Sequence, residues 1–193
     1  MDVKGYEIIL ASGSPRRKAF FEQLGIPFTQ KVIPVEEVYP ESLSGQAIVE
    51  YLVKLKAEPF KSTLQEKQIV ITADTIVWHQ NQCLGKPKNT AEATQMLNAL
   101  SDTSHQVMTA VGFLQKNSWD SICCTSEVNF SKLNPEAIAA YVATASPLDK
   151  AGAYGIQDAF GMHYIHSIQG SYTNIIGLPV AQLVEKLEEI ITN

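Results

Sequence analysis

A nearly continuous apolar run near the middle of the chain, residues 68–78, constrains the fold more than any other segment. The run contains Ile69, Val70, Ile71 and Ile76, and β-branched residues of this kind favour strands. A strand that is apolar at consecutive positions is covered on both faces, as in a parallel sheet flanked by helices. The 193-residue chain is therefore predicted to be an α/β protein.

Strand and helix patterns alternate along the rest of the chain. Strands are expected at 3–11, 28–33, 68–78, 106–114, 121–130 and 162–168. Helices are expected at 15–24, from a Ser42 or Ser44 cap through Lys56, from the capping box Asn89–Glu92, at 134–143 and at 178–191. The strands 106–114 and 121–130, joined by a polar turn, predict a long antiparallel hairpin. The expected fold is a mixed β-sheet with this hairpin, flanked by helices.

The composition excludes several protein classes. Hydrophobic residues make up 45% and charged residues 18% of the chain, which is ordinary for one core-forming domain. No apolar run approaches the roughly 18 residues that span a bilayer, and the N-terminal residues do not resemble a signal peptide. We expect a cytoplasmic protein. The net charge of −5 argues against nonspecific nucleic-acid binding.

The cysteines and histidines do not predict a metal site. Cys83, Cys123 and Cys124 form neither a disulfide framework nor a zinc motif, so we expect buried or half-buried thiols. His163 and His166 lie three residues apart in an expected strand, where their side chains would point to opposite faces.

An anion site is indicated where the first strand meets the first helix. Residues 12–17, Ser-Gly-Ser-Pro-Arg-Arg, join small residues to a proline suited to the first helical position. The free N–H groups of a helix start favour phosphate, and Arg16 and Arg17 add full positive charges. A plain helix cap is the alternative interpretation.

Acidic residues occur in two further places. Glu36 and Glu37 follow a short strand and could hold a hard cation, or could simply form a solvated loop. Asp74 interrupts the apolar strand, and a buried carboxylate needs a partner. It could bind Mg²⁺ or orient water as a base, unless it accepts hydrogen bonds from the next turn.

Lysines and a small-residue loop complete the candidate chemistry. Lys86 stands between Gly85 and Pro87, and Lys56 stands near a helix end, where a solvated lysine is the simpler interpretation. Either could hold phosphate oxygens. The segment 149–157 could lie against a ligand, with Gln157 reading a base edge, or could be a tightly packed loop. No Walker loop, dinucleotide fingerprint or serine-hydrolase elbow is present.

Taken together, these segments resemble the Maf family of nucleotide pyrophosphatases. They occur in order from about residue 8 to Pro179, at 10–17, 36–37, Lys56, 73–77, 85–87, 105–109 and 149–157. The last segment is similar to the branch that acts on dTTP and UTP. The resemblance implies a fold like that of the inosine triphosphate pyrophosphatases. It also implies one domain over 1–193, either undivided or with two lobes and the active-site cleft between them.

The resemblance also implies an activity. The chain is expected to be a house-cleaning hydrolase of nucleotide metabolism, a nucleoside triphosphate diphosphatase. It would convert dTTP, UTP and modified pyrimidine nucleotides to the monophosphate and pyrophosphate with a divalent metal, Mg²⁺ or Mn²⁺. Its partners would be the nucleoside triphosphate and a second copy in a homodimer, with no stable nucleic-acid complex and no membrane.

Residue roles follow from the same resemblance. Asp74 resembles the proton acceptor, with Lys56, Lys86 and Glu37 completing the catalytic set, and Glu37 and Asp74 are the implied metal ligands. Arg16, Thr75 and Gln157 resemble specificity positions. The other implied substrate-binding residues are Ser12, Ser14 and Arg17. One departure from the family pattern is that Asp158-Ala159 follows Gln157, where glycine is usual in the family, and this places an added carboxylate near the implied base pocket.

Two other functions are compatible with the residues. A non-catalytic protein that binds a nucleotide or nucleic acid could regulate cell division or septum formation. A pyrophosphatase for modified purine nucleotides would use the same phosphate chemistry. Tyr154 and Gln157 favour a pyrimidine substrate over a purine.

Overall fold

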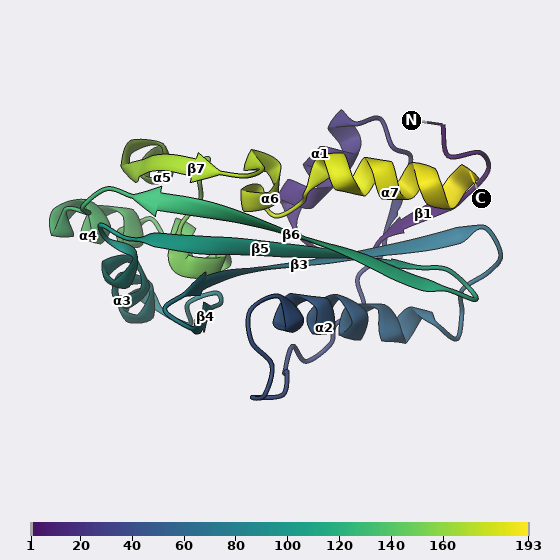
Figure 1. Cartoon of the computed structure of the whole chain (residues 1–193), viewed down its shortest axis with the longest axis horizontal. Helices are drawn as coiled ribbons and strands as arrows, with labels where there is room; N and C mark the ends of the chain where they lie inside the picture. The colour runs from purple at the N-terminus through teal and green to yellow at the C-terminus, as the bar shows by residue number, and fades with distance from the viewer. Residues whose placement is uncertain (1, 193) are drawn as a thin grey trace. The chain divides into compact units, whose positions relative to one another are not determined.

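The computed structural model describes residues 2–192 and has an α/β architecture (Figure 1). The strands are β1 (Glu7–Leu10), β2 (Thr29–Gln30), β3 (Gln68–His79), β4 (Gln82–Leu84), β5 (Ser104–Leu114), β6 (Trp119–Phe130) and β7 (Ile165–Gln169). The α-helices are α1 (Pro15–Gln23), α2 (Gln46–Ala57), α3 (Thr90–Leu100), α4 (Pro135–Ala143), α5 (Ala159–Tyr164), α6 (Tyr172–Ile176) and α7 (Val180–Thr192). The short 3₁₀ helices are η1 (Glu58–Phe60), η2 (Ser146–Asp149) and η3 (Ala151–Ala153).

The strands form one mixed sheet, which confirms the predicted fold class. Within residues 2–192 the sheet has seven strands in the order β2-β1-β3-β5-β6-β7, with β4 added to β3. Strand β1 pairs in parallel with β2 and β3, so that Leu10 lies opposite Ile71. The β3–β4 and β6–β7 pairs are antiparallel. The predicted long hairpin is β5–β6, whose turn is closed by Gln115 N–H donating to the Ser118 carbonyl at 3.0 Å.

The chain divides into two compact units. Unit 1 comprises residues 1–74, 109–124 and 177–193, and unit 2 comprises residues 75–108 and 125–176. Strands β3, β5 and β6 each contribute residues to both units. Asp74 is the last residue of unit 1 along β3, and Thr75 is the first of unit 2.

The core of unit 1 follows the two-residue period of its strands. Ile8 and Leu10 belong to one hydrophobic cluster, whereas Ile9 and Ala11 belong to another. Successive strand residues point to opposite faces, so the sheet of this unit is covered on both sides. Helices α1 and α7 lie on one side and α2 lies on the other (Figure 1). The apolar run 68–78 therefore has the double coverage that its sequence predicts.

Unit 2 contains two helices with side-chain caps and a buried core with aromatic residues. The Asn89 side chain accepts a hydrogen bond from Glu92 N–H at 2.9 Å, and the Asn134 side chain accepts one from Glu136 N–H at 2.8 Å. These caps satisfy helix N–H groups that would otherwise lack partners, and both were predicted. The rings of Phe130 and Tyr154 pack edge to face in the buried cluster of this unit, with their centroids 4.8 Å apart.

Several predicted boundaries are wrong. Strands β1 and β2 are shorter than the expected 3–11 and 28–33. Helix α2 is preceded by Gly45, with φ of +52°, and not by a serine cap. Glycine adopts this left-handed conformation without the penalty that a Cβ imposes. Tyr51 of this helix is 38% exposed.

The segment 162–168 is partly helical. Met162, His163 and Tyr164 end α5, and only the residues from Ile165 onward form β7. The expectation that His163 and His166 point to opposite faces of one strand is therefore wrong. The short elements β4 and α6 were not predicted. The three cysteines are free, half-buried thiols, as expected.

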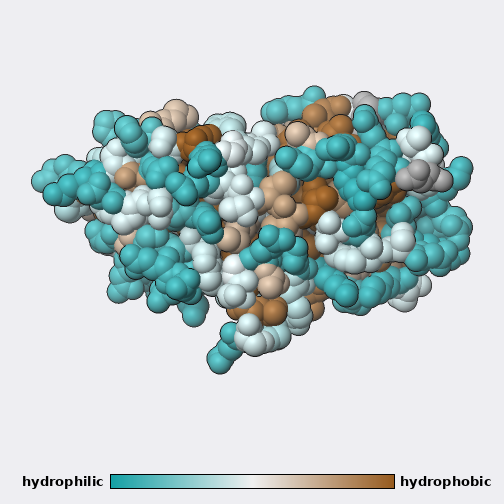
Figure 2. All heavy atoms as spheres, in the orientation of Figure 1, coloured by the Kyte–Doolittle hydropathy of each residue, from teal (hydrophilic) through white to brown (hydrophobic). Residues whose placement is uncertain are grey.

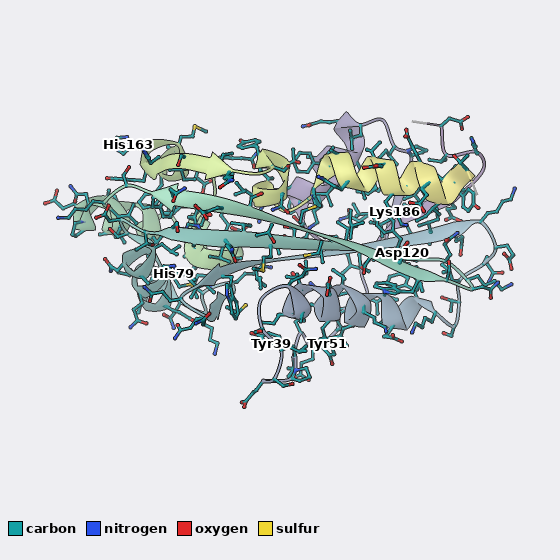
Figure 3. All side chains as sticks on the ribbon, in the orientation of Figure 1. Tyr39, Tyr51, His79, Asp120, His163 and Lys186 are labelled. Carbon is teal, nitrogen blue, oxygen red and sulfur yellow. The ribbon has the colours of Figure 1, made fainter. Side chains whose placement is uncertain are left out.

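The surface carries scattered apolar side chains. On the face drawn in Figure 2, brown side chains occur in a few places among hydrophilic ones. An ion pair connects helix α7 to the sheet: Lys186 of α7 pairs with Asp120 of β6 (Figure 3). None of the helices within residues 2–192 has the length and apolar character that crossing a membrane requires.

Candidate functional site

The turn between β1 and α1 is organised around the buried Ser12 side chain. Ser12 Oγ accepts a hydrogen bond from Ser14 N–H at 3.3 Å, and the Ser12 carbonyl accepts one from the Gln30 side chain at 2.7 Å. Ser14 occupies the N-cap position with extended backbone, and Pro15 begins the helix. The Ser14 side chain makes no cap hydrogen bond. Its N-cap position therefore does not depend on its hydroxyl.

Arg17 lies in the first turn of helix α1, and two hydrogen bonds hold its guanidinium. Its Nε donates to the Gly177 carbonyl at 2.9 Å, and its Nη1 donates to Ser12 Oγ at 3.2 Å. Burial lowers the pKa of Arg17, while the charge of Asp74 raises it, Arg16 lowers it and Glu37 raises it. Arginine remains charged under such conditions. Arg17 thus places a preorganised cation in the electrostatic field of Asp74 and Glu37.

Lys56 joins the two predicted acidic sites. Its Nζ lies 3.0 Å from Glu37 Oε1 and 3.2 Å from Asp74 Oδ2. The side chains of Lys56 and Asp74 are only 17% and 13% exposed, whereas that of Glu37 is 54% exposed. Lys56 is therefore not a freely solvated helix-end lysine. The partly buried carboxylate in β3 has a cationic partner, as its position in an apolar strand requires.

The remaining predicted residues have separate positions. Arg16 follows Pro15 on α1, beside Arg17. Thr75 follows Asp74 on β3 and is half-buried. Lys86 is exposed in the loop after β4. That loop is held against η3, because Gly152 N–H donates to the Gly85 carbonyl at 3.1 Å. Unit 2 thus brings the loop of Lys86 beside the segment that leads to Gln157.

Tyr154 does not have the role that its sequence position indicated. Its side chain is buried, and its hydroxyl lies 2.7 Å from His105 Nε2. Burial, and to a smaller extent the neighbouring His79, lowers the pKa of His105 to about 3. Tyr154 is a core residue of unit 2, so it cannot support a pyrimidine over a purine by contact. Gln157 is exposed and is available for a ligand.

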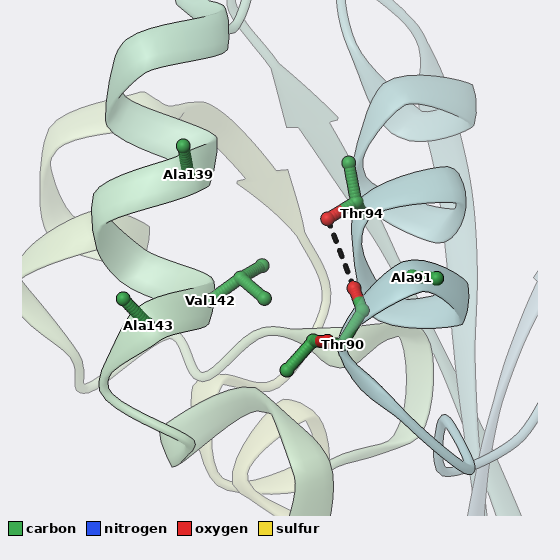
Figure 4. A pocket seen from close by; sticks show the side chains of 6 residues that line it. All are labelled: Thr90, Ala91, Thr94, Ala139, Val142 and Ala143. Carbon is green, nitrogen blue, oxygen red and sulfur yellow. Dashed lines mark hydrogen bonds between the residues drawn. The ribbon is translucent and has the colours of Figure 1, made fainter.

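A hollow between α3 and α4 lacks the chemistry of a phosphate site. Its volume is about 370 Å³, and its lining residues are Thr90, Ala91, Thr94, Ala139, Val142 and Ala143 (Figure 4). The Thr94 hydroxyl is already used, because it donates to the Thr90 carbonyl at 2.9 Å. With no cationic side chain in its lining, this hollow cannot neutralise a triphosphate.

Two partners in the site were not predicted from the sequence. The Gly177 carbonyl fixes Arg17, and the Gln30 side chain fixes the backbone of Ser12. A backbone carbonyl has no side-chain signature, so no pattern could have identified the first. Gln30 is a polar residue inside the expected strand 28–33, and its position there was a weak signal for the second.

The chain is thus an α/β protein whose first strand–turn–helix carries a half-buried arginine, and whose two carboxylates, Glu37 and Asp74, share one lysine. The family model described as "Maf-like protein" matches residues 7–190. The chain belongs to the Maf family.

Curated relatives are similar over nearly their whole length. A protein of Flavobacterium johnsoniae named dTTP/UTP pyrophosphatase is 45% identical over 98% of this chain and 97% of its own. A protein of Bacteroides fragilis with the same name is 40% identical over 96% of both chains. Among solved structures, a nucleoside-triphosphatase / dITP/XTP pyrophosphatase from Mycobacterium abscessus aligns over 96% of both chains, with 11% identity and a TM-score of 0.45.

Proposed function

We propose that this protein is a nucleoside triphosphate pyrophosphatase that hydrolyses dTTP and UTP. Water attacks the α-phosphorus, the bond from that phosphorus to the oxygen that bridges the α and β phosphates breaks, and the products are the nucleoside monophosphate and pyrophosphate. The observation that carries the proposal is the cluster of Arg17, Lys56, Asp74 and Glu37 in a chain of the Maf family. The names of its 40–45% identical relatives support the substrate assignment.

Cations in the proposed site neutralise the triphosphate. Phosphoryl chemistry depends mainly on positioning and on charge stabilisation, because negative charge moves onto the leaving pyrophosphate. Arg17 is fixed by Ser12 and Gly177 before substrate arrives, so its guanidinium loses little freedom on binding. In unit 1, Arg16 and Lys56 supply further positive charge, and Ser12 and Ser14 line the turn. Lys86 is the proposed phosphate-binding lysine of unit 2.

Asp74 is the proposed general base. Its carboxylate is 13% exposed and lies 3.2 Å from the Lys56 ammonium, and a carboxylate held in this way can accept a proton from an attacking water. Lys56 also fixes the direction of the carboxylate. Asp74 takes the proton from the water molecule as that water attacks the phosphate.

The donor set fits a divalent cation. Glu37 and Asp74 already converge on one positive group, the Lys56 ammonium. Mg²⁺ and Mn²⁺ prefer carboxylate oxygens and are commonly held by one or two of them together with substrate phosphates. When bound, such an ion would neutralise charge that develops on the phosphates. Glu37 and Asp74 are the residues that would hold it.

Gln157 and Thr75 are the proposed specificity residues, together with Arg16. A glutamine amide offers one acceptor and two donor hydrogens. Thymine and uracil present an adjacent N–H and carbonyl, which such an amide can match with two hydrogen bonds. Gln157 is exposed at the end of the small-residue loop, where its amide is free of the core.

The proposal includes the setting of the enzyme. We expect a cytoplasmic homodimer with no stable nucleic-acid complex. The net charge of −5 supports the last point, because polyanion binding requires a broad basic surface. Light scattering coupled to size-exclusion chromatography tests the dimer, and a mass of one chain would contradict it.

Pyrophosphate release from a nucleotide panel tests the proposed activity. The panel comprises dTTP, UTP, ITP and 7-methyl-GTP, each with Mg²⁺ or Mn²⁺. We expect dTTP and UTP to be the fastest substrates and Asp74→Asn to reduce their turnover by about 10²- to 10⁴-fold. Asp120→Asn, which changes a carboxylate on β6 that pairs with Lys186, is the matched control. Faster hydrolysis of ITP would favour the purine alternative, and no turnover at all would favour a binding protein.

A further inference from the structure

Gln157 lies inside a tight turn whose two ends are both held. The turn spans residues 155–158 and is closed by Asp158 N–H donating to the Gly155 carbonyl at 3.1 Å. Gln157 is exposed, whereas Gly155 and Asp158 are half-buried. The orientation of the Gln157 amide therefore depends on what fixes Gly155 and Asp158.

The Tyr141 hydroxyl binds both ends of this turn. It donates to Asp158 Oδ2 and accepts a hydrogen bond from Gly155 N–H at 3.2 Å. Tyr141 belongs to α4, and its ring stacks on Phe160 with centroids 4.4 Å apart and planes 6° apart. One buried side chain thus connects the residues before and after Gln157 to a helix.

The Asp158 carboxylate has further partners in the same loop. Ser146 Oγ donates to Asp158 Oδ2 at 3.2 Å, and Lys150 Nζ lies 3.5 Å from the same oxygen. Lys150 is 12% exposed and also donates to the Ser146 carbonyl at 2.6 Å. The added carboxylate that follows Gln157 is therefore neutralised within the loop.

Close packing and backbone strain show that the segment is held tightly. A Cβ on Gly161 would lie 2.1 Å from the Gly155 carbonyl oxygen, so α5 directly contacts the turn. Ala153 is buried with φ of +61°, a left-handed conformation that is unfavourable for alanine. Such a conformation persists only where surrounding contacts enforce it.

We propose that Tyr141 and Asp158 are positioning residues that hold the Gln157 amide for the polar edge of a pyrimidine base. This inference rests on the proposed function, because it assigns Gln157 to base recognition. Asp158 does not contact the substrate. It determines specificity through the turn, so its effect falls on the base and not on the phosphates.

Tyr141→Phe removes the hydroxyl and keeps the ring that stacks on Phe160. We expect the KM for dTTP to rise about fivefold to tenfold with kcat nearly unchanged, because the lost interaction orients a group that binds substrate and transition state equally. Tripolyphosphate carries the phosphates without a base. Its inhibition constant should stay at the wild-type value, and the preference for dTTP over dCTP should fall.

Asp158→Asn, alone and combined with Tyr141→Phe, tests whether the two residues act together. Tyr141→Phe removes the hydrogen bond between the two side chains, and Asp158→Asn removes the charge of its acceptor, so their effects on KM should be clearly less than additive. Asp149→Asn is the matched control. Its carboxylate lies 2.9 Å from the same Lys150 Nζ, but the Asp149 side chain is 62% exposed and lies outside the turn 155–158, so the KM of this variant should equal that of the wild type.

The outcomes separate this inference from the proposed function. A wild-type protein that does not hydrolyse dTTP or UTP refutes the proposed function and this inference with it. An active wild type whose KM is unchanged by Tyr141→Phe and by Asp158→Asn overturns the positioning role alone. A parallel rise in the tripolyphosphate inhibition constant, or a loss of kcat without a change in KM, also overturns it, because general damage to the fold would then explain the result.

Discussion

Lys56 Nζ of helix α2 lies 3.2 Å from Oδ2 of Asp74, which is a residue of the apolar strand β3. The pair explains how β3 tolerates a carboxylate between Ala73 and Ile76. It also brings a carboxylate and an ammonium group together at Asp74, the last residue of unit 1 along β3. The proposed chemistry depends on this relationship.

Lys56→Ala should lower kcat/KM for dTTP by about 100-fold, because a cation that stabilises developing phosphate charge is lost and Asp74 loses its partner. Pyrophosphate release measures the effect. Lys54→Ala is the control, since Lys54 lies on the same helix and is exposed. Nearly equal rates for the two variants would contradict the assignment of Lys56.

Arg17→Lys should raise the KM for dTTP about tenfold, because lysine cannot reproduce the two directed donors that reach Gly177 and Ser12. Steady-state kinetics with dTTP provides the measurement. Lys18→Ala serves as control, because Lys18 is exposed and its ammonium lies 3.5 Å from Glu22, on the same helix. If Arg17→Lys keeps the wild-type KM, the guanidinium geometry is not needed for binding.

Glu37→Gln should raise the Mg²⁺ concentration for half-maximal activity by about tenfold, since one of two charged ligands is replaced by a neutral one. Removing divalent ions with EDTA should stop turnover, and adding Mg²⁺ or Mn²⁺ should restore it. Glu36→Gln is the control at the adjacent exposed position. An unshifted Mg²⁺ dependence in Glu37→Gln would remove this residue from the metal site.

The folded protein should lose stability in mild acid because of His105. Its pKa falls from the ordinary value of 6.5 to about 3 in the folded state, so between these values the unfolded chain binds the extra proton. The contribution of His105 to the free energy of unfolding is complete above pH 6.5. Below this pH it falls by about 1.4 kcal/mol per pH unit. Urea unfolding at pH 7 and pH 5 measures the loss, which should be smaller in His105→Asn. An equal loss in both proteins would refute the account.

Local signals predicted much of the fold. Three of these signals depend only on residues that are close in sequence: the β-branched run of β3, the Asn89 cap of α3 and the Asn134-Pro135 start of α4. The segment 162–164 was misassigned because a short apolar run is compatible with either a helix or a strand. Gly45 replaces the expected serine caps because the backbone there requires a positive φ.

The candidate site was predictable in its residue types and less so in its contacts. The arginines, the carboxylates and Lys86 were proposed as candidates from their positions in turns, loops and a strand, whereas the role of Lys56, near a helix end, was implied by the family resemblance. The sharing of Lys56 between Glu37 and Asp74 depends on tertiary packing between distant segments. The burial of Tyr154 and the two contacts of the Tyr141 hydroxyl likewise have no local signature.

Phosphorus NMR of dTTP incubated with the protein and Mg²⁺ tests the central claim most directly, because it identifies which phosphate bond breaks. The account predicts that dTMP and pyrophosphate appear together and in equal amounts. The formation of dTDP and free phosphate would contradict cleavage between the α and β phosphates, and unchanged dTTP would contradict the activity itself.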